Sequence, residues 1–313
     1  MTDLILSVSL PTYNHAIYLP ERIPSILAAM PQNAELIIVD DGSTDNSEEI
    51  IRSFAEQDSR IIFMKNEKNL GVIKSLHKIT ATARGKYMSF LSADDYILPE
   101  YFSKILHFAE KYPSFAIYVS NFGYSNDVIP KSHDEIKSDF LLPNPKGPSF
   151  FGPKQTIHLF SHTAFWVPAH CSIIQRETLL QLGGFREEFK HNTDWFLFHA
   201  AALIGGVAYL PETLAVWRLD NKGYTSQTTN HDQNLFNVQI SIFNYLRKSE
   251  RKDLRPLFAR SGVLRGVLKQ RFFYFLFRPV YWDFLLFSCI RYIRNSWKKL
   301  RAKFSTSLSF SHH

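Results

Sequence analysis

The sequence is poor in cysteine, with only Cys171 and Cys289 among its 313 residues. Two thiols so far apart supply neither a disulfide framework nor the paired spacing of a zinc finger, so we expect a reducing compartment. A long apolar run is also missing, because Arg278, Pro279 and Asp283 interrupt the most hydrophobic segment. These interruptions disfavour a transmembrane span.

Two nucleotide-binding signatures are absent as well. No Gly-x-Gly-x-x-Gly follows the first predicted strand, which disfavours a dinucleotide site of the Rossmann type, and no Walker A sequence occurs. The opening segment LILSVSL is too short for a secretory signal, and we expect none. What the sequence does contain is 45% hydrophobic residues, enough for one large domain or one domain with an extension.

The positive charge is concentrated at the end of the chain. From Arg251 onward, 14 Lys and Arg stand against two acids, which leaves +12. The whole chain carries +7, so the first 250 residues carry −5. A basic tail on a mildly acidic body predicts a polyanionic partner for the tail.

Apolar residues in this tail repeat at steps of four and three, which predicts one helical stripe formed by Leu286, Ile290, Ile293, Trp297, Leu300 and Phe304. Basic residues occupy the other faces. The pattern is typical of a helix lying in an anionic membrane interface, and it predicts a peripheral protein on the cytoplasmic face of the plasma membrane. The alternative is a terminal helix packed on the body with a solvated basic face. Nucleic acid binding is a weaker interpretation of the same charges, and we expect none.

Strand-like and helix-like segments alternate over the first 120 residues. The predicted strands are 4–10, 34–40, 60–65, 86–92 and 115–120. The predicted helices are 18–30, 43–57, 71–83 and 99–111. Short continuous apolar strands separated by helices predict an α/β fold with a parallel sheet that is covered on both faces. In such sheets ligands bind beyond the carboxyl ends of the strands.

The remaining segments differ in character. Residues 123–153 are rich in Pro, Gly, Ser and Asn, which predicts a long loop. A loop of this length is either a candidate acceptor lid or a disordered insertion. Residues 231–304 are predicted to be mostly helical.

Polar residues follow three of the predicted strands, as PTYNH (11–15), DDGSTD (40–45) and SADD (92–95). In a parallel sheet these groups lie on one rim. Four carboxylates gathered there need a cation or several hydrogen-bond donors, and they are those of Asp40, Asp41, Asp94 and Asp95. Mg²⁺ or Mn²⁺ suits carboxylate oxygens and commonly completes its shell with substrate phosphates. Taken alone, DDGSTD is equally consistent with a turn and a helix N-cap, and SADD is also consistent with a helix cap. Their recurrence favours a crevice for a metal–diphosphate ligand.

Six segments, taken in order, resemble glycosyltransferase family 2. They are SVSLPTYNHAIYLPERIPSIL, LIIVDDGSTDNS, NEKNLGV, ARGKYMSFLSADDYILPEY, CSIIQRETLLQLGGFREEF and NTDWFLFHAAALIGGVAYLPETLAVWRLD. The resemblance implies a GT-A fold, a Rossmann-like α/β/α sandwich with a mostly parallel sheet, over residues 1–228. A helical C-terminal extension, residues 229–313, would follow it.

The resemblance also implies roles for individual residues. The nucleotide base and ribose would be held by Pro11, Thr12, Tyr13, Asn14, Asp40 and Asp41. Asp94 would contact the ribose side, and Asp95 would bind Mn²⁺ or Mg²⁺ on the donor diphosphate. Arg84 would approach the nucleotide, or else be a surface charge at a helix end.

Three positions depart from the family pattern. Thr193 stands where the family usually has Glu, directly before Asp194, the candidate general base or the N-cap of the next helix. Asp220 stands at the family's His position after Arg218, where a hard cation remains a candidate ligand. Ser92 replaces the first Asp of an Asp-x-Asp-Asp pattern, while the last two acids are retained.

A zinc site is a further alternative, because His158, His162, His170, Cys171 and His191 lie within 34 positions of one another. The sequence contains no His-Glu-x-x-His and no cysteine pair, so acceptor contacts or surface histidines are the preferred interpretation.

Together the residues and the resemblance predict an inverting, metal-dependent glycosyltransferase. The donor would be a nucleotide-sugar, most simply a UDP-sugar. The acceptor would be a saccharide or a lipid-linked hydroxyl in cell-surface polysaccharide or glycolipid synthesis. The alternatives are a non-catalytic sugar-nucleotide-binding scaffold of the same fold and a phosphotransfer domain that uses Asp40 and Asp41.

Overall fold

The structure is a computed structural model that describes residues 4–93, 95–125, 136–143, 145–218, 232–248, 251–270 and 272–287. Asp94, Asp220 and most of the predicted tail stripe lie outside these ranges. The description below concerns the described residues.

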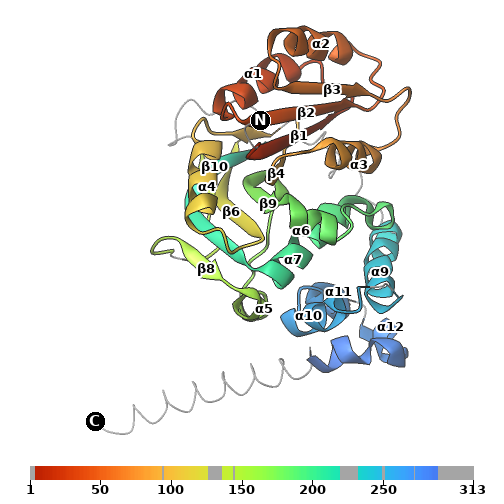
Figure 1. The fold of residues 1–313 in the computed structure, drawn as a ribbon. Helices are drawn as coiled ribbons and strands as arrows, with labels where there is room; N and C mark the ends of the chain where they lie inside the picture. The colour runs from red at the N-terminus through yellow and green to blue at the C-terminus, as the bar shows by residue number, and fades with distance from the viewer. Residues whose placement is uncertain are drawn as a thin grey trace.

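A single ten-stranded sheet forms the centre of the fold (Figure 1). Its strands are β1 (Leu6–Thr12), β2 (Ala34–Asp40), β3 (Ile61–Lys65), β4 (Tyr87–Phe90), β5 (Tyr96–Ile97), β6 (Ile117–Ser125), β7 (Lys137–Asp139), β8 (Ser149–Phe151), β9 (Ser172–Gln175) and β10 (Val207–Arg218). The order is β3-β2-β1-β4-β9-β6-β10-β5, with β7 beside β6 and β8 beside β10.

The principal strands of the sheet run in the same direction. Strands β3, β2, β1 and β4 pair in parallel, as do β6 and β10. The short strand β9 lies antiparallel between β4 and β6. The predicted α/β fold with a mostly parallel sheet is confirmed, and β9 is an addition that the alternation of segments did not predict.

Helices cover the sheet, and further helices follow it toward the C-terminus (Figure 1). They are α1 (Leu19–Ala29), α2 (Ser47–Gln57), α3 (Val72–Thr82), α4 (Tyr101–Lys111), α5 (Pro153–His162), α6 (Arg176–Gln181), α7 (Thr193–Gly205), α9 (Asp232–Lys248), α10 (Leu254–Ser261), α11 (Arg265–Gln270) and α12 (Phe272–Leu276). Three 3₁₀ segments, η2 (Ala169–Cys171), η3 (Glu187–Asn192) and η4 (Pro279–Tyr281), join them.

The sequence explains why the sheet is interior. All seven residues of β2 are buried, as the continuous apolar run of AELIIVD requires for a strand that is covered on both faces. Helix α7 is also buried along almost its whole length and is apolar around its circumference. It ends where Gly206 adopts a φ of 81°, a conformation that side chains with a Cβ rarely adopt.

The segment 123–153 is more ordered than the predicted loop. Its first three residues complete β6, while β7 and β8 pair antiparallel with β6 and β10. The regular structure arises from long-range pairing, which the local abundance of Pro and Gly conceals. The predicted lid function remains a proposal, since residues 126–135 lie outside the described ranges.

The described C-terminal helices pack on the body of the protein. Phe258 of α10 stacks on Phe196 of α7 with ring centroids 5.1 Å apart. Tyr245 of α9 contacts both Phe189 and Phe196 with centroids 5.5 Å apart. These helices therefore share one hydrophobic core with the sheet. None of the helices in the described part of the chain has the length and apolarity needed to cross a bilayer.

Candidate active site

The carboxyl ends of β1, β2 and β4 meet at one rim of the sheet, as the sequence predicts. Thr12 at the end of β1 is in register with Asp40 at the end of β2. The Asp41 amide donates to the Thr12 carbonyl at 2.8 Å, which fastens the two strand ends together. Pro11 lies beside Thr12 in β1, and Tyr13 follows with a 39% exposed side chain.

The loops after β1 and β2 are bonded to each other. The Asn14 amide donates to Ser43 Oγ at 2.9 Å, and Asn14 Oδ1 accepts from the Thr44 amide at 2.8 Å. Asp45 Oδ2 accepts from the Ala16 amide at 3.0 Å. Asn14 adopts a φ of 53°, which Asn tolerates better than most residues. Asn14 thus shapes this rim by joining two loops, whatever it contacts in a ligand.

Asp40 presents a buried oxygen without a partner among the described residues. Its side chain is fully buried, and Oδ1 accepts from both the amide and the hydroxyl of Ser43. Oδ2 is buried and accepts no hydrogen bond. Because buried acceptors are normally satisfied, Oδ2 is suited to a donor N–H or O–H supplied by a ligand.

Both carboxylate oxygens of Asp41, in contrast, accept hydrogen bonds from other residues of the protein. Its Oδ1 accepts from Asn66 Nδ2 at 2.6 Å and from the Leu70 amide at 3.0 Å, and its Oδ2 accepts from the Gly71 amide at 2.8 Å. Both oxygens therefore hold the loop that precedes α3. The predicted nucleotide contact of Asp41 is not what this geometry favours, and the carboxylate acts as a support for the rim.

Gly42 allows this loop to lie against the strand end. A Cβ at this position would fall 2.5 Å from the Lys68 backbone, and the residue has a φ of 75°. Both constraints restrict the position to glycine. Gly42 of DDGSTD is therefore needed for close backbone approach, which is more than a simple turn requires.

Asp95 lies in the turn between β4 and β5. Its Oδ2 accepts from Ser92 Oγ at 2.7 Å, and its Oδ1 accepts from the Arg218 amide at 3.2 Å. The position of Ser92, where related patterns have an acid, is thus filled by a donor that orients Asp95. Arg218, two residues before Asp220 in the sequence, is the last residue of β10. The end of this strand therefore lies directly beside the turn that contains Ser92 and Asp95, which we call the acidic turn.

Two arginines stand at this turn, and the sequence did not predict the first of them. Arg22 of α1 is only 2% exposed, and its Nε donates to the Ser92 carbonyl at 3.1 Å. The guanidinium of Arg218 lies over the rings of Tyr18 and Tyr96, 5.0 and 4.6 Å from their centroids. Cationic groups this close reduce the repulsion between neighbouring carboxylates, which answers the electrostatic problem that the SADD segment poses.

Aromatic side chains gather beside Asp95. Tyr124 and Trp217, cross-strand partners on β6 and β10, stack with centroids 6.1 Å apart. His170 packs against Phe122 and Trp217 at 5.1 and 5.9 Å. Burial lowers the pKa of His170, and the nearby Asp95 carboxylate opposes that shift. Because strand pairing assembles this cluster from distant segments, no local motif could reveal it.

Asp194 stands in the first turn of α7, and the orientation of that helix places it near the same rim. The far end of α7 meets the start of β6, where the Ala116 amide donates to the Gly205 carbonyl at 3.2 Å. Phe198, one turn after Asp194, contacts Phe90 at the end of β4 with centroids 6.0 Å apart. Asp194 therefore lies at the carboxyl-end side of the sheet.

Asp194 is half-buried, so its carboxyl group is only partly shielded from bulk water. Desolvation raises its pKa, although hydrogen bonds from backbone amides oppose the shift. Its Oδ1 accepts from the Trp195 amide at 2.7 Å. The Thr193 side chain, at the family's Glu position, accepts from the Arg186 amide at 2.6 Å and so fastens the start of α7.

Arg84 lies at the other end of the sheet. Its Nε and Nη2 donate to Glu35 Oε2 at 2.9 and 2.6 Å, and its amide donates to Glu35 Oε1 at 2.7 Å. Glu35 is the second residue of β2, so Asp40 is about 17 Å away along the strand. Arg84 is not brought together with the nucleotide residues, because its helix runs back from the rim to the amino ends.

We expect Glu35→Ala to lower the free energy of unfolding by about 2–3 kcal/mol, because it leaves the buried Ser7 hydroxyl and the Arg84 amide without their acceptor. Arg84→Ala should cost less than about 1 kcal/mol, since the arginine side chain is 66% exposed. Urea unfolding measures both values. Nucleotide binding should be unchanged in Arg84→Ala, and a clear loss of binding would restore Arg84 to the nucleotide site.

The sequence matches the family described as Glycosyl transferase family 2 over residues 7–181. The chain belongs to that family. An uncharacterised glycosyltransferase from Haemophilus influenzae is 27% identical to this glycosyltransferase over 254 residues, which cover 78% of this chain and 75% of the relative.

Solved structures share the fold. Staphylococcus aureus TarS 1–349 in complex with UDP-GlcNAc superposes with a TM-score of 0.61 at 18% identity, over 85% of this chain and 76% of TarS. The mannosyltransferase PcManGT from Pyrobaculum calidifontis, in complex with GDP-Man and Mn²⁺, gives 0.56 at 15% identity, over 98% and 80%. At these identities the likeness establishes the fold alone, and it confirms the predicted fold class with helices at the C-terminus.

A divalent cation fits the donor atoms at the acidic turn. Asp95 offers hard carboxylate oxygens that are already oriented by Ser92 and the Arg218 amide, and Mg²⁺ or Mn²⁺ commonly takes one or two carboxylates and substrate phosphates. Among the described residues no three His, Cys, Asp or Glu side chains form a metal-binding group. Asp94 and Asp220, the other predicted acids, lie outside those residues.

The zinc alternative gains no support. His158 and His162 stack on α5 with ring centroids 3.9 Å apart, while His170 belongs to the aromatic cluster near Asp95. Cys171 is buried against the Pro168 carbonyl. Within the described part of the chain these side chains do not converge on one point.

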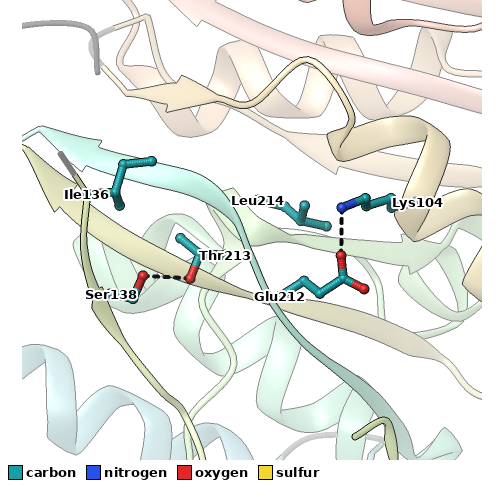
Figure 2. Close-up of a pocket in the computed structure, with 6 residues that line it drawn as sticks. All are labelled: Lys104, Ile136, Ser138, Glu212, Thr213 and Leu214. Carbon is teal, nitrogen blue, oxygen red and sulfur yellow. Dashed lines mark hydrogen bonds and ion pairs between the residues drawn. The ribbon is translucent and has the colours of Figure 1, made fainter. Parts of the chain in front are cut away.

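A cavity of about 300 Å³ lies elsewhere, between β7, β10 and α4 (Figure 2). Its walls carry the Lys104–Glu212 ion pair, 2.7 Å long, and a 2.9 Å hydrogen bond from Thr213 Oγ1 to Ser138 Oγ. These polar groups satisfy one another, unlike Oδ2 of Asp40. None of the predicted site residues lines this cavity, so we place the active site at the rim.

Proposed function

We propose that this family 2 glycosyltransferase transfers a sugar from a UDP-sugar to an acceptor hydroxyl with inversion at the anomeric carbon, using Mn²⁺ or Mg²⁺. The proposal is supported by the carboxyl-end side of the sheet, where Asp40 has an unsatisfied buried oxygen, Asp95 has an oriented carboxylate and Asp194 stands in the first turn of α7. The non-catalytic scaffold is not favoured by the family or its relatives.

The nucleotide would bind across the ends of β1 and β2. Asp40 Oδ2 needs a donor, and the N–H of a uracil-type base supplies one. Tyr13 is exposed beside it and offers an apolar ring face. Asp41 would act through the loop that it holds, and Asp94 would complete the ribose side.

The diphosphate would lie at the acidic turn. Asp95, with Asp94 and Asp220 as further candidates, would hold the cation, which supplies charge stabilisation at the departing diphosphate. Arg22 and Arg218 contribute positive charge at the same turn. Asp194 would accept the proton of the acceptor hydroxyl as that hydroxyl attacks the anomeric carbon. Attack from the side opposite the leaving group inverts the configuration.

The acceptor would lie over the aromatic cluster near Asp95. The rings of Tyr124 and Trp217 offer flat apolar faces, to which the C–H faces of a saccharide can pack. A saccharide or lipid-linked hydroxyl of a cell-surface precursor fits this arrangement. The placement on the inner face of the plasma membrane belongs to the same proposal.

A panel of nucleotide-sugars tested by thermal shift, with and without Mn²⁺, examines the donor. At a concentration of 100 times Kd the correct donor should raise Tm by about 4 °C. NMR of the product then gives the anomeric configuration. UDP-sugars with Mn²⁺ should give the largest shift and a product of inverted configuration. Equal shifts with and without the metal, or a retained configuration, would contradict the proposal.

A further inference from the structure

The last described segment of the chain exposes apolar side chains where a soluble helix would carry polar ones. We define the apolar patch as the seven exposed apolar residues of this segment, which are Phe272, Phe273, Leu276, Phe277, Val280, Trp282 and Leu286. Phe273 and Phe277 are 72% and 76% exposed. Contiguous apolar surface of this kind marks an interaction site.

The patch is the outer face of a segment whose inner face is already buried. Phe275, Tyr281 and Phe284 pack on Phe243 of α9, with centroids 4.7, 5.9 and 5.0 Å apart. The exposed rings are therefore not needed for the internal core. The segment is therefore apolar on both faces.

The patch is also continuous in space. Phe273 and Phe277 are one helical turn apart, as are Trp282 and Leu286 in the helical residues 282–287. Trp282 Nε1 donates to the Leu276 carbonyl at 2.9 Å, which joins the two groups. The indole thus keeps its polar atom bonded while its ring remains 52% exposed, an arrangement suited to a boundary between water and hydrocarbon.

The net positive charge of the segment that carries the patch indicates what kind of surface the patch binds. The described residues from 251 onward contain seven Lys and Arg and two acids, and both acids are paired internally. Arg251 binds Asp253 at 3.0 Å, and Arg255 binds Asp283 at 2.7 Å. Residues 288–313 add six Lys and Arg and no acid. An apolar surface on a segment with a net positive charge complements an anionic lipid bilayer, and a protein partner needs no such combination.

We infer that the apolar patch docks on an anionic membrane surface, with Phe273, Phe277 and Trp282 entering the boundary between headgroups and acyl chains. Lys269 and Arg265, one turn apart and exposed on α11, would lie at the level of the headgroups. This assigns the contact to a folded surface that precedes most of the predicted tail stripe in the sequence and shares Leu286 with it. It rests on the proposed placement at a membrane and is independent of the chemistry at the rim.

Flotation of the full chain with lipid vesicles tests this assignment. Vesicles of phosphatidylcholine and phosphatidylglycerol in equal parts should carry the protein, and vesicles of phosphatidylcholine alone should carry much less. Phe273→Ser with Phe277→Ser should lower binding to the mixed vesicles about tenfold or more. Arg265→Gln with Lys269→Gln should lower it several-fold at low salt and little at about 1 M salt, where charges are screened.

Leu180→Ser is the matched control, since Leu180 is 45% exposed but lies on α6, outside the patch. Its flotation should equal that of the unaltered chain. Unchanged flotation of the Phe273/Phe277 variant would overturn the inference. A second result would also overturn it. If neither vesicle floats the unaltered chain, and if the unaltered chain self-associates in sedimentation while the Phe273/Phe277 variant does not, the patch joins two copies of the protein. Donor-induced thermal shifts should be the same in all these variants, so failure of this inference and failure of the proposed function are separable.

Discussion

Asp194→Asn should lower kcat for sugar transfer by about 10³-fold, because a general base contributes roughly 10²–10⁴-fold to such a step. The asparagine keeps an oxygen for the Trp195 amide, which now donates to Asp194 Oδ1 at 2.7 Å. Geometry at the start of α7 is therefore preserved while proton acceptance is lost. Donor affinity, measured by calorimetry with UDP and Mn²⁺, should change less than about threefold.

The dependence on pH separates a base from a structural carboxylate. Desolvation raises the pKa of Asp194, so the acid limb of kcat/KM should lie above the ordinary aspartate value of about 3.9. Residual activity of the asparagine variant should lack that limb. Glu188→Gln is the control, since Glu188 lies six residues earlier with a 48% exposed carboxylate and should leave kcat and the limb unchanged.

Stability provides a second control. A carboxyl whose pKa is raised in the folded state ionises more readily in the unfolded chain, so this group lowers stability as pH rises through its unfolded and then its folded pKa. Asp194→Asn should therefore leave Tm at neutral pH unchanged or slightly higher. A loss of transfer with an unchanged or higher Tm assigns the residue to chemistry. Full activity in this variant would exclude Asp194 as the base.

Much of the sheet was predictable because each parallel strand is a continuous buried run. The predicted strand 34–40 coincides with β2, and 60–65 differs from β3 by one residue. Strand β9 was missed for the opposite reason: it has four residues and is defined by its pairing with β4 and β6. Pairing between distant segments leaves no periodic trace in a sequence of that length.

The site divides in the same way. Asp40 and Asp95 could be predicted at the carboxyl-end side of the sheet because Asp40 ends strand β2 and Asp95 follows strand β4 by five residues. The supporting role of Asp41 depends on a loop 25 to 30 residues away, and the burial of Arg22 depends on a turn 70 residues away. The family resemblance implied that Arg84 approaches the nucleotide, while its partner Glu35 is 49 residues away. A residue's place at the end of a predicted strand therefore indicates its position in the fold better than its closeness in sequence to a motif.

Asp95→Asn should abolish the metal-dependent part of donor binding while preserving the turn. The side-chain oxygen of the asparagine can still accept from the backbone N–H of Arg218, as Asp95 Oδ1 does at 3.2 Å. The neutral asparagine side chain supplies no negative charge to a cation. In calorimetry the unaltered protein should bind UDP more tightly with Mn²⁺ than without it. The variant should bind UDP equally weakly in both conditions, with a loss of about tenfold or more relative to the metal-bound state.

Asp58→Asn is the matched control for this change, since Asp58 also binds an arginine, Arg60 at 2.7 Å, but precedes β3 at the amino ends of the strands. It should bind UDP and Mn²⁺ as the unaltered chain does. A second variant at the same turn locates the effect. Ser92→Ala removes the 2.7 Å hydrogen bond to Asp95 Oδ2 and should weaken Mn²⁺-dependent binding by a smaller factor. If Asp95→Asn keeps the full metal dependence of UDP binding, other acids hold the cation and the assignment of Asp95 is refuted. A small loss in Ser92→Ala and a larger loss in Asp95→Asn would support a metal at this turn.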